Sequence, residues 1–336
     1  MSLAPSVAVP RTAFNLLSLY IVVFCLLWSF AFVAGKIGVT DCPPLILLAA
    51  RFSLAGVLIL GISALRSETW DLSWRDAVVF AVLGVANNAL YLGLGYTGLQ
   101  TVSAGLGGLI VSANPVFTAI LAALLLGEAM TLRKVTGLLL GIVGVAFIVW
   151  HRMSVGTDDW HGILFTLASL VSIVIGTILF KVLAPRGSLW IGNGIQNIAG
   201  GLAVTPFAFT LSSVSEIVPS ARLLGAFAFL VLGGSIMAYL LWFHLLKVCG
   251  ATAASAYHFL MPPLGMLFAF LVLGEHVEFR DLLGIVPVAL GIYLVTRPAV
   301  SVSAKRSVTY GLSSSGLTGQ SSIPETTFST EKPRRT

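Results

Sequence analysis

Long apolar segments follow one another along almost the whole chain, and they limit the fold more than any other feature of the sequence. A helix that crosses the hydrocarbon core of a bilayer needs about 20 mostly apolar residues. The sequence predicts ten such helices, and the links between them are short, so neighbours are expected to lie antiparallel. The predicted helices are 14–38, 45–65, 77–98, 102–126, 132–150, 159–183, 188–210, 222–246, 251–273 and 281–297.

The low charge content agrees with a lipid environment. Of the 336 residues, 57% are hydrophobic and 10% are charged, whereas a soluble domain carries roughly 25% charged residues. A soluble protein with so few charges could not cover its surface, but a bilayer solvates apolar side chains directly. We therefore predict an all-α membrane protein with the lipid bilayer as a partner. Its net charge of +6 is assigned to loops, and no nucleic acid is expected.

The distribution of Lys and Arg predicts the orientation of the chain. Cytoplasmic loops of membrane proteins are enriched in these residues, and with ten crossings most of them fall on the side that holds both termini. Residues 1–13 are then a cytoplasmic N-terminus and 151–158 an extracytoplasmic loop. Residues 298–336 are rich in Ser, Thr and Gly, and we expect them to form a disordered cytoplasmic tail.

An internal repeat divides the chain into two halves, 14–150 and 159–297. Residues 104–144 align without a gap on residues 251–291, an offset of 147 positions (251 minus 104). Each half contains five predicted helices, and because five is odd, the second half enters the membrane from the opposite side. Inverted repeats of this kind are typical of secondary transporters, whose solute site lies between the halves. The informative matches are Pro115 with Pro262, Gly127-Glu128 with Gly274-Glu275, and Arg133 with Arg280.

Four stretches carry a resemblance to a known family. They are Leu27-Trp28-Ser29-Phe30 through Lys36, Ala50-Arg51-Phe52, Asn114 to Ala119 continuing to Gly127-Glu128, and Pro262 to Gly274-Glu275. Over 14–297 the chain resembles the EamA-like family of the drug/metabolite transporter (DMT) superfamily. The resemblance implies an exporter of amino acids, drugs or other metabolites in a bacterial inner membrane. The chain departs from its own repeat at Pro263, which follows Pro262 directly.

Polar side chains on helical stripes give the candidate solute cavity, because such groups are costly in a membrane unless they face protein or water. The predicted cavity residues are Trp28, Ser29, Asn88, Tyr91, Asn114, Tyr239, Tyr257 and His258. Mid-helix Pro115 and Pro262 are predicted to kink their helices, because each removes a backbone hydrogen bond. For Glu128 and Glu275 we expect charge pairing with Arg133 and Arg280 at the membrane edge.

Arg51 is the cation placed well inside an apolar segment. It either approaches a solute carboxylate or donates to helix-end carbonyls, and the sequence favours the structural role. Phosphorylated solutes would need several Lys or Arg facing the path, so neutral or zwitterionic amphipathic solutes are favoured, with amino acids first.

The residues that are missing narrow the function. No Asp or Glu falls in the middle of a predicted helix, so we expect flux without a strict need for a proton gradient. The sequence has no P-loop and no metal-ligand spacing, and Cys25, Cys42 and Cys249 form no redox motif. We therefore expect a transporter of small molecules, with no enzymatic activity, cofactor or metal.

Three alternatives stay open at this stage: a lipid flippase, a membrane assembly subunit, and a carrier of sugar-type metabolites. A flippase should have a polar groove that opens sideways to lipid, whereas a transporter should have a closed central cavity. A second copy of the chain, in a homodimer, is also left open as a partner.

Overall fold

The computed structural model describes residues 11–66, 71–155, 159–275 and 279–296. The predicted tail 298–336 and most of the predicted N-terminus 1–13 lie outside these residues. The described secondary structure is helical throughout, which confirms the predicted all-α class. The elements are α1 (Arg11–Asp41), α2 (Pro44–Leu65), α3 (Trp74–Leu83), η1 (Gly84–Leu92), α4 (Gly93–Leu99), α5 (Ala104–Val111), α6 (Asn114–Leu126), α7 (Leu132–Val155), α8 (Trp160–Leu183), α9 (Leu189–Leu211), η2 (Val214–Glu216), α10 (Ala221–Phe229), η3 (Leu230–Ala238), α11 (Tyr239–Cys249), α12 (Ala251–Ala256), η4 (Tyr257–Leu260), α13 (Met261–Phe268), η5 (Ala269–Leu273) and α14 (Phe279–Thr296).

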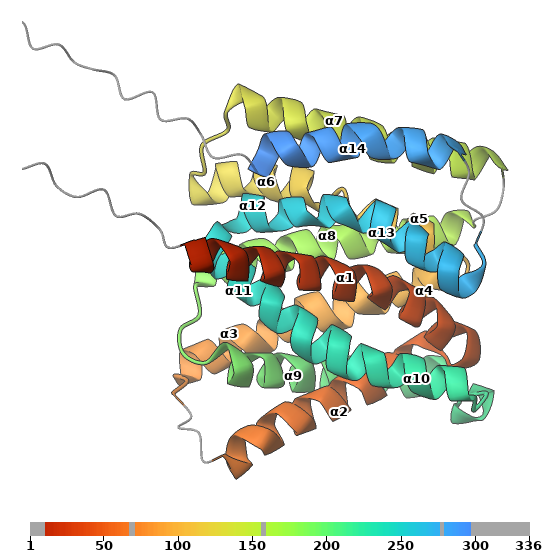
Figure 1. The fold of residues 1–336 in the computed structure, drawn as a ribbon. Helices are drawn as coiled ribbons and strands as arrows, with labels where there is room; N and C mark the ends of the chain where they lie inside the picture. The colour runs from red at the N-terminus through yellow and green to blue at the C-terminus, as the bar shows by residue number, and fades with distance from the viewer. Residues whose placement is uncertain (1–10, 67–70, 156–158, 276–278, 297–336) are drawn as a thin grey trace, which may run out of the picture. The chain divides into compact units, whose positions relative to one another are not determined.

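Consecutive elements join into ten helical segments within the described residues, and Figure 1 shows them lying side by side along a common direction. Seven of these are long and apolar enough to cross a membrane by length and composition. The segments outside that set are α7, α9 and α14, so the predicted count of ten crossings is confirmed in part. The helix α9 is less apolar because it carries a buried cluster of amide side chains.

Helix ends follow local signals in the sequence. The side chains of Ser73, Ser103, Asp159 and Ser220 each accept a hydrogen bond from a backbone N–H in the first turn of the helix that follows, as N-cap residues do. Leu126 and Leu273, at equivalent positions of the repeat, are each followed by a glycine with φ of 67°. This left-handed conformation stops a helix at little cost when the residue is glycine.

Several distortions of the helices recur at equivalent places in the two halves. The third segment contains the π-helix η1, and its repeat mate, the eighth segment, contains the π-helix η3. The fourth segment is interrupted between α5 and α6, just before Pro115, and the ninth is tightened into the 3₁₀ turn η4, just before Pro262. Each proline therefore lies in the first turn of a new helix, where its missing N–H costs no intrahelical bond.

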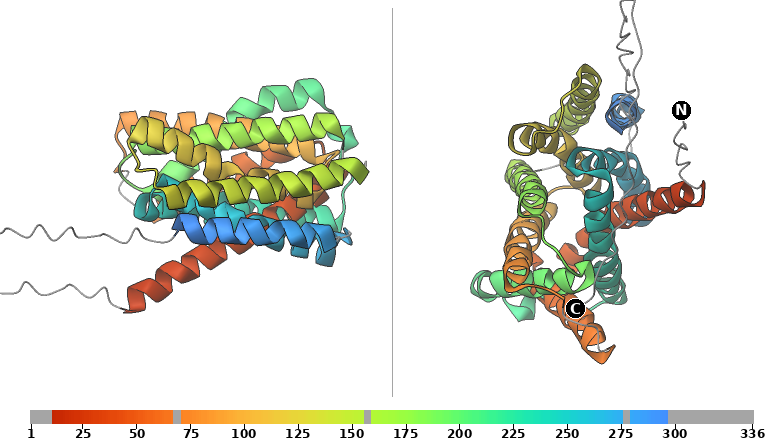
Figure 2. Two further views of the ribbon diagram at one scale, coloured as in Figure 1. Left: turned by 90° about the horizontal axis from the view of Figure 1, so that it is seen from above. Right: turned by 90° about the vertical axis from the view of Figure 1, so that its left-hand side faces the viewer.

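Helices of the two halves pack against each other in matching pairs. The helix α2 packs on α9, α6 on α12, and α7 on α14, while α1 lies against η3 and α4 against α8. Figure 2 shows these pairs in the view along the helices. This exchange of partners is the arrangement expected of two related halves, and it places α1, α2, η1, α4 and η3 around the centre.

Close contact between α7 and α14 depends on two glycines. A Cβ added to Gly137 would lie 2.8 Å from the carbonyl oxygen of Gly291, and a Cβ added to Gly291 would lie 2.5 Å from the carbonyl oxygen of Gly137. Membrane helices commonly use small residues for such backbone approach. The pair α7 and α14 lies at one edge of the bundle in Figure 1.

Candidate functional site

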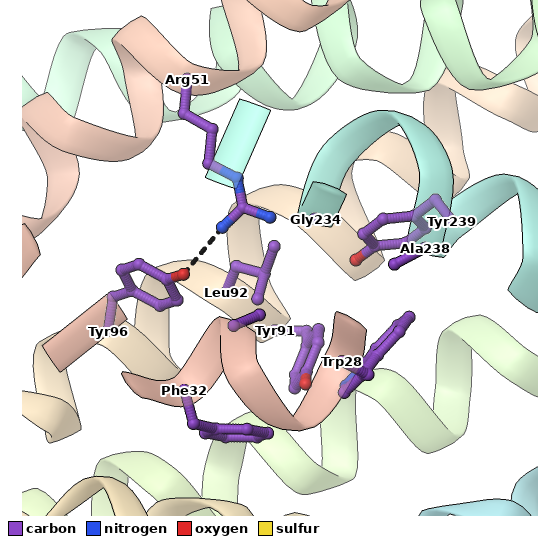
Figure 3. Close-up of a pocket in the computed structure, with 10 residues that line it drawn as sticks. Trp28, Phe32, Arg51, Tyr91, Leu92, Tyr96, Gly234, Ala238 and Tyr239 are labelled. Atoms are coloured by element: carbon purple, nitrogen blue, oxygen red, sulfur yellow. Dashed lines mark hydrogen bonds between the residues drawn. The ribbon is translucent and has the colours of Figure 1, made fainter. Parts of the chain in front are cut away.

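A fully buried arginine lies between the two halves. Arg51 on α2 is 2% exposed. Its Nε donates a hydrogen bond of 2.8 Å to Oγ of Ser235 on η3, and its Nη1 donates one of 2.8 Å to the hydroxyl of Tyr96 on α4. These bonds go to side chains of the third and eighth segments and not to helix-end carbonyls, as Figure 3 shows for the bond to Tyr96.

The partners of Arg51 within the described residues are all neutral. Its guanidinium carbon lies 5.5 Å from the ring centroid of Phe52 and 5.7 Å from that of Tyr96. None of the ion pairs found in the described part of the chain includes Arg51. A guanidinium stays charged in proteins, so Arg51 brings an uncompensated positive charge to the centre of the bundle.

A central cavity opens beside Arg51. Both halves contribute to it, and the space for the centres of water-sized spheres is about 30 Å³. Since a single water needs roughly 10–15 Å³ by this measure, the cavity in this conformation holds little more than a water or two. Its lining residues are Trp28, Ala31, Phe32, Arg51, Tyr91, Leu92, Tyr96, Gly234, Ala238 and Tyr239.

Aromatic rings form the wall away from Arg51. Trp28 on α1 lies between two tyrosines, with ring centroids 6.5 Å from Tyr91 and 5.4 Å from Tyr239. The hydroxyl of Tyr239 donates a 3.0 Å hydrogen bond to the backbone oxygen of Asn87, which fixes this side chain across the two halves. In Figure 3 the three rings lie together on one side of the cavity and the guanidinium on the other.

A second small cavity lies beyond this one. The two cavities share Phe32, Tyr91, Leu92 and Tyr96 in their linings, so these side chains separate them. Gly95, Leu99, Gly107, Val111, Thr166 and Ser169 complete the lining of the second cavity. Rotation of Phe32 and Leu92 would therefore join two small spaces into one larger one.

A buried amide cluster supports the site from behind. Asn88 on η1 donates to Oδ1 of Asn197 at 3.2 Å and accepts from Nε2 of Gln196 at 3.0 Å. Asn193 and Asn197 on α9 both donate to the backbone oxygen of Ser235, at 2.9 and 3.4 Å. Because Ser235 also accepts from Arg51, the cluster holds the arginine in a fixed position.

The structure brings four of the predicted site residues together and places the others elsewhere. Trp28, Tyr91, Tyr239 and Arg51 line the central cavity. The others lie outside its lining: Asn88 in the amide cluster, Asn114 accepting from Thr118, Ser29 fully buried, Tyr257 half-buried and His258 among aromatic rings. Their part in solute binding remains a prediction.

His258 lies in an aromatic cluster next to the cavity. Its ring is fully buried, and its Nδ1 lies 3.1 Å from the backbone oxygen of Ser255. The ring meets Trp242 edge-on at 4.8 Å and Trp28 at 5.4 Å between centroids. His258 therefore packs against Trp28, one ring of the aromatic wall.

Polar contacts join the two halves at both ends of the bundle, and we call them the inter-half ties. At the Asp41 end, the carboxylate of Asp41 on α1 accepts hydrogen bonds from Ser220 and Arg222 at the start of α10. At the same end, Glu275 accepts hydrogen bonds of 3.0 and 3.3 Å from the backbone N–H groups of Ala104 and Gly105. At the opposite, Asp76 end, the corresponding contacts join Asp76 to the backbone N–H of Arg186 at 3.2 Å, and Thr252 to Glu128.

These ties give Glu128 and Glu275 a role that the sequence did not suggest. Each glutamate ends one long helical segment and binds the start of its repeat mate in the other half. A carboxylate at a helix N-terminus is stabilised by the unpaired N–H groups and the helix dipole. The predicted pairing of Glu275 with Arg280 falls on a side chain outside the described residues.

Comparisons with known proteins agree with this architecture. A model of the EamA-like transporter family matches residues 15–150 and 160–297. An uncharacterized transporter of Archaeoglobus fulgidus is 27% identical over 270 residues, covering 80% of this chain and 95% of the relative. An uncharacterized transporter of Bacillus subtilis is 28% identical over 293 residues, covering 85% and 92%.

Two further relatives extend the comparison. A WAT1-related chloroplastic protein of Arabidopsis thaliana is 24% identical over 290 residues, covering 81% of this chain and 67% of the relative. A crystal structure superposes with a TM-score of 0.64 at 18% identity, covering 83% of this chain and 98% of the other. The superposition supports the fold.

Proposed function

Because the chain belongs to the EamA-like transporter family, we propose that this multi-pass membrane transporter exports small metabolites, amino acids or other amphipathic compounds by alternating access between its two inverted halves. The membrane is a bacterial inner membrane and both termini face the cytoplasm, which puts the Asp76 end inside and the Asp41 end outside. The solute passes through the central cavity between the halves.

The observation that carries this proposal is the cavity itself. It is lined by residues of α1, α2, η1 and α4 from the first half and of η3 and α11 from the second, and it lies between the two sets of inter-half ties. All four ties are formed and the central cavity is small, about 30 Å³, as expected of an occluded state. Breaking the ties at one end while keeping those at the other would open the cavity to one side at a time.

The lateral surface favours a carrier of water-soluble compounds over a flippase. A groove between α2 and the start of α10 is lined by Cys42, Ile46, Leu47, Ala50, Ile217, Pro219, Ser220, Ala221, Leu223, Leu224 and Phe227. Apart from Ser220, these side chains carry almost no polar group that could bind a lipid headgroup. The described lining of the central cavity holds one cation, Arg51, which also disfavours sugar phosphates, because these need several.

A tolerance assay tests the proposal. Bacteria that express the wild type should accumulate less of an inhibitory amino acid or amphipathic drug than cells with an empty vector. The double variant Trp28→Ala/Tyr239→Ala, which removes the aromatic wall, should lose this effect. The matched control is Trp150→Ala, because Trp150 is 78% exposed on the outer face of α7.

Equal accumulation in wild-type, double-variant and empty-vector cells for every solute class would contradict export through this cavity. A loss that Trp150→Ala shares with the double variant would point to lowered expression of the protein, so the amount of each variant in the membrane is measured alongside.

A further inference from the structure

The charge of Arg51 has no counter-ion in the described residues, although this side chain is buried deep between the halves. Removing an ion from water costs several kcal/mol unless a partner of opposite charge compensates. The other buried polar groups around Arg51 are hydroxyls and amides, which lower this cost only in part. A bound negative charge would therefore stabilise Arg51 at this site.

The geometry leaves part of the guanidinium available to the cavity. The Nε–H group and one N–H of Nη1 donate to Ser235 and Tyr96, and these two bonds fix the plane of the guanidinium. The remaining N–H groups on Nη1 and Nη2 have no partner among the described residues. Gly234 stands next to Nη2, and a Cβ added there would lie 2.7 Å from this nitrogen. The glycine thus keeps free the space in front of donors that suit a two-oxygen anion.

From this geometry we propose that Arg51 binds the carboxylate of the transported solute, so that the site selects amphipathic organic acids with a single negative charge. The proposal rests on the transport function proposed above and names its substrate class. The carboxylate meets Nη1 and Nη2, and the apolar part of the solute lies against Trp28, Tyr91 and Tyr239 on the opposite wall.

The same linings predict that an amino group on the solute is not required. No described carboxylate lines the central cavity or the second cavity, so an ammonium group finds no counter-ion there. Aromatic faces attract a cation only weakly compared with an ion pair. The site should therefore accept an acid with or without an α-amino group and reject the corresponding amine.

The size of the solute follows from the side chains between the two cavities. The central cavity has about 30 Å³ of usable space in this conformation, too little for an organic acid. Displacement of Phe32 and Leu92 by the apolar part of the solute would join it to the second cavity, which is lined by small residues such as Gly95, Gly107 and Ser169.

Four matched probes test the inference by thermal unfolding of the purified protein in detergent. They are 3-phenylpropionate, phenylalanine, 3-phenylpropanamide and phenethylamine, which share a phenyl ring and differ in charge. We expect the acid and the zwitterion to raise the melting temperature of the wild type saturably, and the neutral amide and the amine to leave it unchanged. Wild type stabilised equally by all four, or by none, overturns the proposal.

Variants assign the effect to Arg51. Arg51→Gln should weaken the response to 3-phenylpropionate by at least about 10-fold in half-saturating concentration, as expected for loss of a charged hydrogen bond. Arg51→Lys should retain part of it, and Arg66→Gln, an exposed arginine at the end of the same helix, should behave as wild type. If Arg51→Gln does not fold, the proposal is still tested by comparing how 3-phenylpropionate and 3-phenylpropanamide change the melting temperature of the wild type.

Flux in proteoliposomes separates this inference from the transport proposal. Acid-specific stabilisation with no flux of any probe would keep the carboxylate site and contradict transport. Flux of all four probes at similar rates would keep transport and contradict the carboxylate site.

Discussion

Glu275 offers a direct way to bias the bundle toward one open side. Its carboxylate binds two backbone N–H groups at the start of α5, in the other half of the chain, at 3.0 and 3.3 Å. Loss of a side chain that caps a helix N-terminus costs about 0.5–2 kcal/mol, and the charge adds about 0.3–1 kcal/mol through the helix dipole. Since Glu275 is half-buried, we take about 1–2 kcal/mol for Glu275→Ala.

The contact joins the two halves only in the state that is closed at the Asp41 end. Glu275→Ala therefore destabilises this state and leaves the state open at that end unchanged. A change of one to two kcal/mol corresponds to a factor of about 5–30 in an equilibrium. Glu275→Ala should therefore raise the population that is open at the Asp41 end by about 5- to 30-fold. Glu128→Ala, at the repeat-equivalent position, should do the same at the Asp76 end.

A buried cysteine reports which end is open. Ser169 is fully buried and lines the second cavity, so Ser169→Cys, in a chain whose native Cys25, Cys42 and Cys249 are replaced, should react slowly with a membrane-impermeant maleimide. In oriented membrane vesicles, Glu275→Ala should speed labelling from the Asp41 side only, and Glu128→Ala from the Asp76 side only.

The control is Glu216→Ala. Glu216 also binds a backbone N–H, that of Ser213 at 2.7 Å, but within the loop before α10 and therefore inside one half. This variant should leave both labelling rates unchanged. Equal acceleration from both sides by Glu275→Ala, or none, would refute the reasoning that this contact closes one end.

Three further predictions follow from the packing and the polar groups. Gly291→Ala should lower the melting temperature, because its Cβ would lie 2.5 Å from the carbonyl oxygen of Gly137 and overpacking costs about 1–3 kcal/mol. The control Gly61→Ala, whose Cβ would have no atom within 4 Å, should leave the melting temperature unchanged. Equal melting temperatures of the two variants would contradict the close contact of α7 and α14. Asn197→Leu removes the oxygen that accepts a hydrogen bond from Asn88. A buried polar group without a partner costs about 1–3 kcal/mol, so thermal unfolding should show a destabilisation of this size. An unchanged melting temperature would argue against the amide cluster. Initial rates of flux in proteoliposomes should be equal with and without an imposed proton gradient, because no described carboxylate lines either cavity, and strict dependence on the gradient would contradict this.

The fold was largely predictable from the sequence because its strongest signals are simple ones. Apolar segment length predicts the helices, and the shared Pro and Gly-Glu positions predict the repeat, whose equivalent halves appear in the structure as matching helix ends and matching π-helices. The family predicted from four short stretches is the one whose model matches both halves. What could not be predicted is where regular α geometry stops.

The residues that were missed fall into two groups with different causes. Tyr91 was predicted, but Tyr96 was missed, because a spacing of five places two residues on different faces of a regular α-helix. Both nevertheless line the central cavity. The amides of α9 at positions 193, 196 and 197 do follow helical spacing, and this stripe was a usable signal. Arg51 was predicted from its position, but its neutral partners come from distant segments and are visible only in the structure.

The central claim, that the two ends open in turn, is tested most directly by locking one end. The carboxylate of Asp41 lies 2.6 Å from Oγ of Ser220 across the halves, so Asp41→Cys/Ser220→Cys in a chain without native cysteines should form a disulfide on oxidation. The account predicts that oxidation abolishes flux of a labelled solute in proteoliposomes, that reduction restores it, and that the cavity remains open to labelling from the Asp76 side throughout. Undiminished flux through the fully oxidised protein would contradict alternating access.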